Sequence, residues 1–256
     1  MSEIDPGAAL QEQRRLTEAL AAQREAVTTY RELVDADTAS DSPANSRIWR
    51  ISFPDGPIDE NELVTVSGHR LVGGTDLNPD GYRPALARSL ANLGSTISDL
   101  GRRAEALPMQ EEAVAIRREL AADSPEWYRD DLAVSLSNLG STMSALGRPS
   151  EAVAVTAEAV VILRQLAAER DGYRPVLAVS QANLGIWLSQ LGRSVEALAA
   201  KQEAVATLRQ LATASPDEYR SNLATSLSDL AETLDLMGRS AEAILALSEA
   251  TALAEK

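Results

Sequence analysis

The sequence predicts an all-α protein, an α-solenoid of helix-turn-helix repeats with a short irregular or β-hairpin insert near the N-terminus. Two observations predict it. The tripeptide Asn-Leu-Gly at residues 92–94 returns at 138–140 and 183–185, and as Asp-Leu-Ala at 229–231, with spacings of 46, 45 and 46 residues. Gly-Arg pairs keep the same period and begin at residues 101, 147, 192 and 238. A fixed period of this length is typical of repeat proteins that stack into solenoids.

The residue pattern of each repeat predicts two helices joined by a tight turn. In the last repeat the first helix opens with Ser215, Pro216 and Glu218, which read as a capping box with proline at the first helical position. Apolar residues then recur at helical spacing, as at Leu86 and Leu90. The glycine of each Gly-Arg pair is expected to end this helix, because it adopts the left-handed conformation of a C-cap. A second helix, marked by a Glu-Ala pair, follows at once.

The repeat markers also divide the chain. A Tyr-Arg pair recurs near the start of the first helix of each unit, and the four repeats are set at 82–127, 128–172, 173–218 and 219–256. Small residues that recur in register, such as Gly94, Ala106 and Ala113, are expected where neighbouring helices touch, because larger side chains would push the backbones apart.

The N-terminal third departs from the period. Residues 1–47 are interpreted as an N-terminal helix that resembles half a repeat, plus a linker, because residues 18–27 closely match residues 196–205 of a second helix. Arg14 stands where the turn glycine belongs, so one long helix is expected over 8–35. Residues 48–81 form a non-repeat insert. Its β-branched and aromatic residues around the Pro-Asp-Gly-Pro turn at 54–57 favour a β-hairpin or an ordered loop.

The order of small residues resembles a known family. A Leu-Gly pair, a glycine seven residues later and alanines five and twelve residues beyond it are similar to the tetratricopeptide repeat (TPR), and the period of about 45 residues resembles the kinesin-light-chain type. The bulky aromatics of that family are replaced here, by Leu90 and Ile97 in the first repeat and by Gln181 and Leu188 in the third. The resemblance covers residues 82–256. It implies a scaffold that binds peptides or proteins, with no chemistry of its own.

The amino-acid composition limits the classes of partner that the protein can bind. Asp and Glu number 38 against 24 Lys and Arg, and the net charge of −14 disfavours nucleic acid. Cysteine is absent from the sequence, which excludes disulfides and thiolate metal sites. Neither a secretory signal nor an apolar run long enough for a membrane span is evident, so a cytoplasmic protein with no membrane partner is expected.

The sequence carries no recognisable catalytic signature. The sequence holds a single histidine, His69, and no phosphate-binding glycine loop or metal-ligand cluster, so no catalytic residue, metal or cofactor is predicted, and the chain is not expected to be an enzyme. His69 lies in the insert, as do Trp49 and Phe53. Three interpretations of the insert stay open: a passive surface loop, an arm that binds a partner or covers a groove, and a small-molecule or catalytic pocket around these three residues.

The binding residues follow from the resemblance. In TPR proteins the first helix of each unit lines the concave surface, and asparagines there hydrogen-bond a peptide backbone. This places a peptide-binding groove at Arg88, Asn92, Ser95, Ser98, Asn138, Ser141, Ser144, Asn183, Ser189, Asp229 and Glu232. A structural hydrogen bond to a neighbouring helix is the alternative role for the asparagines. The family's lysine-dependent carboxylate clamp is disfavoured, because the only lysines are Lys201 and Lys256, neither on a first helix.

Two further surfaces were weighed. Arginines recur at positions 31, 118, 164 and 209, where ion pairs between repeats are favoured over a stripe for an acidic ligand. In the last helix Ile244, Leu245, Leu247 and Leu253 spread around the helix, so apolar surface should stay open at the C-terminal edge. The predicted function is therefore a non-catalytic scaffold for a protein or peptide partner. The alternatives are a structural or regulatory protein that forms homo-oligomers through the C-terminal edge, and an enzyme or small-molecule binder with its site in the insert.

Overall fold

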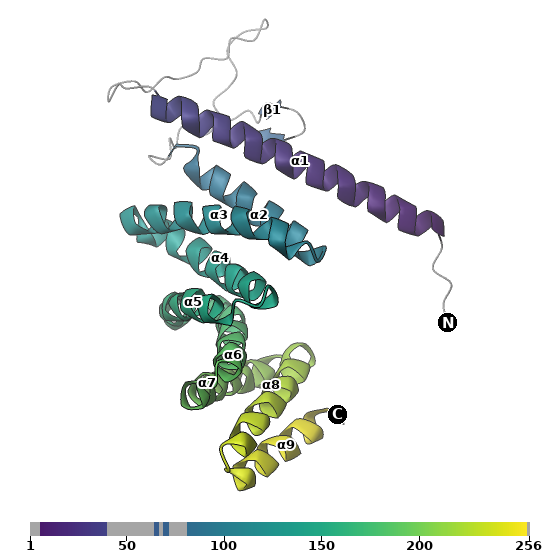
Figure 1. Ribbon diagram of the computed structural model, residues 1–256, viewed down its shortest axis with the longest axis vertical. Helices are drawn as coiled ribbons and strands as arrows, with labels where there is room; N and C mark the ends of the chain where they lie inside the picture. The colour runs from purple at the N-terminus through teal and green to yellow at the C-terminus, as the bar shows by residue number, and fades with distance from the viewer. Residues whose placement is uncertain (1–5, 40–63, 67–68, 72–80, 255–256) are drawn as a thin grey trace, which may run out of the picture.

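The computed structural model describes residues 6–39, 64–66, 69–71 and 81–254, with side chains described over 17–36 and 81–254. A long helix is followed by four helical hairpins that stack side by side (Figure 1). The helices and their bounds are α1 (Pro6–Ala39), α2 (Arg83–Asp99), α3 (Arg103–Asp123), α4 (Pro125–Ala145), α5 (Pro149–Glu169), α6 (Arg174–Gln190), α7 (Ser194–Ala214), α8 (Pro216–Leu236) and α9 (Ser240–Ala254). A 3₁₀ turn, η1 (Asp171–Tyr173), precedes α6.

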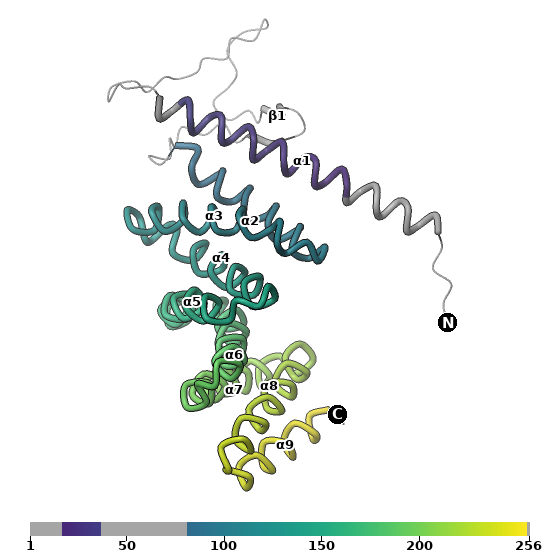
Figure 2. Tube along the Cα trace, in the orientation of Figure 1, coloured from purple at the N-terminus to yellow at the C-terminus, as the bar shows by residue number. Residues whose placement is uncertain are grey.

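The stack has two kinds of helix. The first helices of the hairpins, α2, α4, α6 and α8, are called A helices, and the second helices, α3, α5, α7 and α9, are called B helices. Each helix packs against the next one in the chain, and each A helix also touches the following A helix. Because every hairpin is rotated relative to the one before, the stack winds along its length (Figure 2). This is the predicted α-solenoid of TPR-like repeats.

The recurring glycines close the hairpin turns as expected. Gly101, Gly147, Gly192 and Gly238 have positive φ values of 78°, 75°, 71° and 75°. The arginine after each glycine donates its backbone N–H to the carbonyl five residues earlier, for example from Arg148 to Met143 at 2.9 Å. This hydrogen bond, which closes a loop of six residues, is typical of the Schellman motif and pairs a carbonyl that the helix end would leave without a partner.

The expected capping box at Ser215 is wrong. The Ser215 side chain makes no capping hydrogen bond. Its backbone N–H instead donates to the carbonyl of Leu211 at 2.8 Å, so the same residue ends α7 and precedes α8. The carbonyl of Ser215 accepts from the N–H groups of Glu218 and Tyr219, both at 3.2 Å. The backbone groups of Ser215 therefore bond to both helices, and its side chain does not cap α8.

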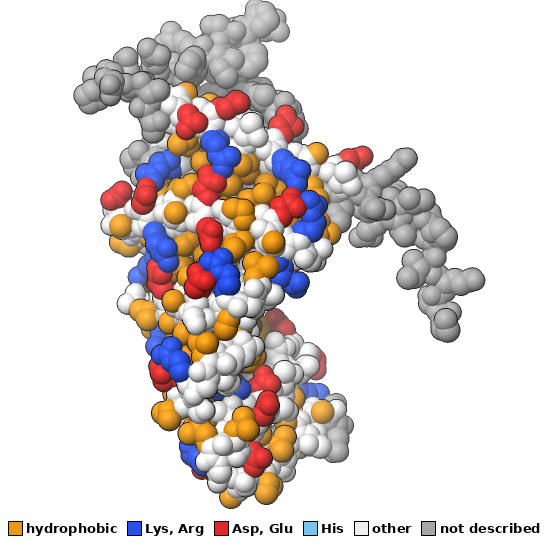
Figure 3. All heavy atoms as spheres, viewed as in Figure 1, with side chains coloured by type: hydrophobic (Ala, Val, Ile, Leu, Met, Phe, Trp, Pro, Cys, Tyr) orange, Lys and Arg blue, Asp and Glu red, His pale blue; other side chains and the backbone are white. Residues whose placement is uncertain are grey.

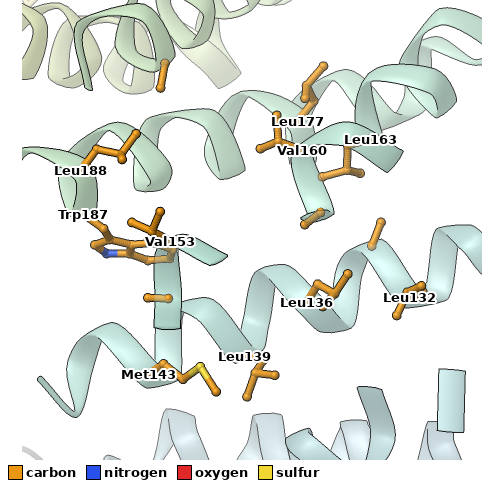
Figure 4. Close-up of a cluster of buried hydrophobic side chains, with 14 of the residues drawn as sticks. Leu132, Leu136, Leu139, Met143, Val153, Val160, Leu163, Leu177, Trp187 and Leu188 are labelled. Carbon is orange, nitrogen blue, oxygen red and sulfur yellow. The ribbon is translucent and has the colours of Figure 1, made fainter. Parts of the chain in front are cut away.

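Apolar side chains form a core that continues along the stack. Three clusters succeed one another, the first over α1 to α3, the second over α3 to α7 and the third over α6 to α9. Figure 4 shows the middle cluster, where Leu136, Leu163 and Trp187 come from three successive helices. The alanines of the predicted contact points are fully buried, with Ala106 and Ala113 both 0% exposed. Small residues thus lie where the helices approach most closely.

The N-terminal region adds a helix and a short hairpin. Helix α1 includes the residues 8–35 expected as one helix, and it packs against α2. Strands β1 (Val64–Val66) and β2 (His69–Leu71) pair antiparallel, with Val66 opposite His69. The hairpin predicted around the turn at 54–57 lies outside the described residues, and so do Trp49 and Phe53.

Candidate functional site

The A helices carry one recurring polar position along the stack. Asn92, Asn138 and Asn183 occupy it on α2, α4 and α6, and Asp229 on α8. Asn92 and Asn138 are exposed, whereas Asn183 and Asp229 are half-buried. Within the described part of the chain, the three asparagine side chains make no hydrogen bond. Their amide groups therefore keep hydrogen-bond donors and acceptors that the described residues do not use.

Hydroxyl groups join successive A helices into one continuous surface. The Ser98 hydroxyl lies 3.3 Å from that of Thr142, and the Ser137 hydroxyl 2.9 Å from that of Ser180. Short side chains at these contacts keep α2, α4 and α6 close together, so that the asparagine of one helix follows that of the next.

A cleft of about 370 Å³ lies where α2, α3 and α4 meet. Four of the predicted groove residues line it, namely Ser95, Ser98, Asn138 and Ser141. Five further residues complete its walls: Asp99, Arg103, Gln110, Thr142 and Ala145. A second hollow of about 380 Å³ adjoins it and shares Arg103 and Ala145. Sequence reasoning missed Arg103 and Gln110, because both lie on a B helix.

The remaining predicted groove residues lie outside this cleft. Arg88 and Glu232 are exposed on α2 and α8, and Ser144 is half-buried near the end of α4. Ser189 donates its hydroxyl to the carbonyl of Gly185 at 3.0 Å within α6. Of the residues singled out in the insert, His69 lies on β2.

Each recurring glycine of the A helices faces one side chain of the adjacent B helix. A Cβ at Gly94 would lie 2.8 Å from Cγ of Gln110, and one at Gly185 would lie 2.5 Å from Cγ of Lys201. The glycines therefore make room for these side chains. Lys201 is only 5% exposed, and burial lowers the pKa of its ammonium group. It donates to the carbonyl of Asp229 at 3.0 Å and to Oγ1 of Thr233 at 2.8 Å.

A second charged cluster is buried between the first two repeats. Arg117 is 6% exposed and donates to the carbonyl of Asp131 at 3.0 Å and to the hydroxyl of Ser135. Burial lowers the pKa of its guanidinium, and nearby Arg88 lowers it further, while Asp131 acts in the opposite direction. These bonds connect α3 to α4, which gives Arg117 a structural role.

The arginines that recur on the B helices form the predicted ion pairs between repeats. Arg118 pairs with Glu158 at 2.6 Å and Arg209 with Glu249 at 2.6 Å, and the hydrogen bond from Arg209 lowers the pKa of Glu249. Arg164 pairs with Glu203, and Arg31 of α1 pairs with Glu112. These four ion pairs are called the ion-pair ladder below. Figure 3 shows acidic and basic side chains next to one another on the visible face. Paired charges of this kind leave no stripe for an acidic ligand among these four arginines.

The ladder shows how α1 fits the stack. In the three ion pairs between B helices, the arginine and the glutamate are 40, 39 and 40 residues apart in the sequence. In the pair made by α1, Arg31 and Glu112 are 81 residues apart. Arg24 of α1 also pairs with Glu105 of α3 at 2.7 Å. Helix α1 therefore occupies the place of a B helix before the first repeat.

The described ranges hold neither a metal cluster nor a membrane span. In the described ranges no group of three or more His, Cys, Asp or Glu residues is arranged to hold a metal ion. None of the helices in those ranges has both the length and the apolar content needed to cross a membrane.

Comparison with known proteins finds two family models that match parts of the chain. The tetratricopeptide repeat model matches residues 7–43, 86–126 and 132–169. A model described as anaphase-promoting complex subunit 5 matches residues 166–215 and 212–256. Among curated proteins none matches this chain. With its helical hairpins stacked in register, the chain is built of tetratricopeptide-type repeats.

One solved structure shares the fold, and two others are similar in part. BtubC (BKLC) from P. vanneervenii is 18% identical, with a TM-score of 0.58, and the match covers 68% of this chain and 65% of BtubC. A Podosopora anserina protein with nearly identical TPR-like repeats, named after kinesin light chain, is 24% identical with a TM-score of 0.46 over 70% of this chain and 78% of its own. MamA is 16% identical with a TM-score of 0.48 over 69% and 88%. The chain thus spans just under two thirds of the length of BtubC.

Proposed function

We propose that the chain is a non-catalytic interaction scaffold that binds a peptide or protein segment along its A helices. The observation that supports this is the row of Asn92, Asn138 and Asn183, whose amides have no hydrogen-bond partner among the described residues and lie on helices in direct contact. An amide offers both a donor and an acceptor, so each asparagine matches the N–H and C=O of an extended backbone. The match to the tetratricopeptide repeat model supports the same function at the level of fold.

The test replaces the three asparagines together. Wild type and an Asn92→Ala, Asn138→Ala, Asn183→Ala variant are used as baits in lysate of the native cell, and bound proteins are identified by mass spectrometry. A control variant changes Gln165 and Gln202 to Ala, because both are exposed on B helices. Circular dichroism checks that all three proteins are equally helical. A partner retained by wild type and control but lost by the triple variant is expected, and identical partners on all three would reject the proposal.

A second candidate function is self-association through the C-terminal edge. Ile244 and Leu247 of α9 are 65% and 48% exposed, whereas Leu198 and Lys201, which occupy the same positions in the preceding B helix, are 6% and 5% exposed. The preceding positions face the next A helix, α8, and α9 has no such neighbour in the described chain. Burying this face against a second copy would remove apolar surface from water.

Sedimentation velocity over a concentration series tests this candidate. Wild type should sediment faster as its concentration rises, and Leu247→Lys should shift the change to higher concentration by placing a charge on the apolar face. Leu236→Lys is the matched control, since Leu236 is also exposed, at 79%, but lies on α8. A wild-type protein that stays monomeric at every concentration would exclude self-association.

A further inference from the structure

The junctions between successive A helices differ at one pair of equivalent positions. One member of the pair lies on a B helix opposite the recurring glycine, and the other lies on the A helix that follows. The pairs are Gln110 with Thr142 at the α2–α4 junction, Thr156 with Trp187 at the α4–α6 junction and Lys201 with Thr233 at the α6–α8 junction.

Side chains occupy the second and third junctions. Trp187 is 6% exposed, and its ring lies against the backbone of Gly140, where a Cβ would be 3.1 Å from Cζ3. At the third junction Lys201 reaches across to α8 and donates to Oγ1 of Thr233 at 2.8 Å. An indole ring in one case and a hydrogen-bonded ammonium group in the other therefore join the neighbouring units.

The first junction is open. Thr142 stands where the next junction has Trp187, and the cleft of about 370 Å³ lies beside it. Gln110 lines this cleft and is 5% exposed, yet its Oε1 has no hydrogen-bond partner among the described residues. Buried polar atoms are nearly always hydrogen-bonded, so this oxygen, like Oε1 of Gln23 and Oγ1 of Thr156 elsewhere in the stack, can accept a further hydrogen bond.

Arg103 adds a charge at the edge of the same cleft. It lies where the cleft meets the adjoining hollow of about 380 Å³. Arg102 beside it donates two hydrogen bonds to Glu105, but Arg103 has no ion pair among the described residues. The equivalent positions of the other repeats hold Pro149, Ser194 and Ser240, so the cation is specific to this junction.

We propose that the α2–α4 cleft is a subsite that binds a backbone amide of an extended peptide at Gln110, with one acidic side chain of that peptide facing Arg103. The proposal rests on the scaffold function above and specifies its ligand. A glutamine amide pairs with a backbone N–H and C=O in either orientation, and its terminal torsion is soft enough to turn toward the cleft. A guanidinium pairs bidentately with a carboxylate. Asp99 in the same cleft repels further acids, so a single acidic residue is favoured over an acidic run.

Nuclear magnetic resonance of the full ¹⁵N-labelled chain tests the subsite with a defined probe. The capped peptide acetyl-Gly-Asp-Gly-amide is titrated in, and the side-chain NH₂ signals of Gln110 are assigned by their loss in Gln110→Leu. Saturable shifts of these signals are expected, with a Kd on the order of 1 mM for so short a ligand. Acetyl-Gly-Lys-Gly-amide should bind about two- to fivefold more weakly, as expected for one exposed ion pair.

Three variants separate the subsite from general effects on folding. The double variant Gln110→Thr, Thr142→Trp rebuilds the pair found at the α4–α6 junction, and should keep wild-type helicity and lose the saturable binding. Gln110→Leu uses the residue found at position 247, and should also lose binding without a lower melting temperature. Arg103→Ser uses the residue of the later repeats, and should bind the Asp and Lys peptides equally.

The outcomes are decisive. No shift at Gln110 up to about 10 mM peptide, far above the expected Kd, would overturn the proposal. Equal affinity in the double variant, or a lower melting temperature in Gln110→Leu, would also overturn it, the latter because Gln110 would then have a structural partner. If the asparagine triple variant loses its cellular partner while Gln110→Leu binds neither less of it nor less peptide, the groove stands and the subsite is wrong.

Discussion

At the scale of single residues, the glycine of the recurring tripeptide is determined by the side chain opposite it. Gly140 shows this most clearly, because both Thr156 and the ring of Trp187 lie where a Cβ would be, the ring at 3.1 Å. In the last repeat the equivalent residue is Ala231, which is 1% exposed and faces α9. The requirement therefore comes from packing between helices and not from the helix itself.

This predicts a loss of stability on adding one methyl group at Gly140. Gly140→Ala should lower the free energy of unfolding by about 1 to 2 kcal/mol, because overpacking outweighs the gain in helix propensity of about 1 kcal/mol. Gly172→Ala is the control, since nothing lies within 4 Å of its added Cβ. Urea unfolding followed by circular dichroism measures both. A Gly140→Ala protein as stable as wild type would show that Thr156 and Trp187 move aside at no cost.

The candidate site was only partly predictable, for a reason visible at the same scale. Asn138 and Ser141 were identifiable because the period places them at fixed positions on an exposed helix face. Position 110 is equivalent to positions 156 and 201, which hold Thr and Lys. The only sequence signal for Gln110 was therefore that the residue type changes from repeat to repeat at a position that is buried. Whether the amide oxygen of Gln110 finds a hydrogen-bond partner depends on how α4 packs against α3, and a local sequence pattern does not specify that packing. Packing geometry thus decides what periodicity leaves open.

At the scale of elements, α1 takes the place of a B helix ahead of the first hairpin. It is held by packing on α2 and by the pairs Arg24 with Glu105 and Arg31 with Glu112. Its likeness to a later B helix was readable from residues 18–27, and four residues further on Arg31 falls in register with Arg209. The partner of Arg31 was not predictable from sequence distance, because 81 residues separate it from Glu112.

Removing the α1 ion pair should loosen that helix alone. Arg31→Ala should cost up to about 1 kcal/mol at low salt, and amides of α1 should exchange with deuterium up to about fivefold faster while those of α4 to α7 are unchanged. Added salt should shrink the difference, since both side chains are about half exposed. Glu32→Ala is the matched control, being exposed and without an ion pair among the described residues. Equal exchange in the two variants would mean that the pair does not hold α1.

At the scale of the whole molecule, the contacts are local. Helices touch their immediate neighbours in the chain or the helix one place further, so the stability of the stack is close to a sum of units and the interfaces between them. Such a fold is unusually readable from sequence, because each unit repeats the same hairpin and the same docking face. The ends are the exception, since α9 keeps Ile244 and Leu247 exposed where an inner helix would cover them.

The unequal steps of the ion-pair ladder have a consequence for how the chain is tied together. Helix α1 makes the lateral contacts of a B helix although the connection to α3 is 81 residues long in place of about 40. Because α1 and the hairpins belong to one chain, the local concentration of α1 at its docking face stays high at any protein concentration. A single cut between residues 40 and 81 would convert this docking into a two-body equilibrium. The first helix would then dissociate on dilution, while the four hairpins stay linked by their own turns.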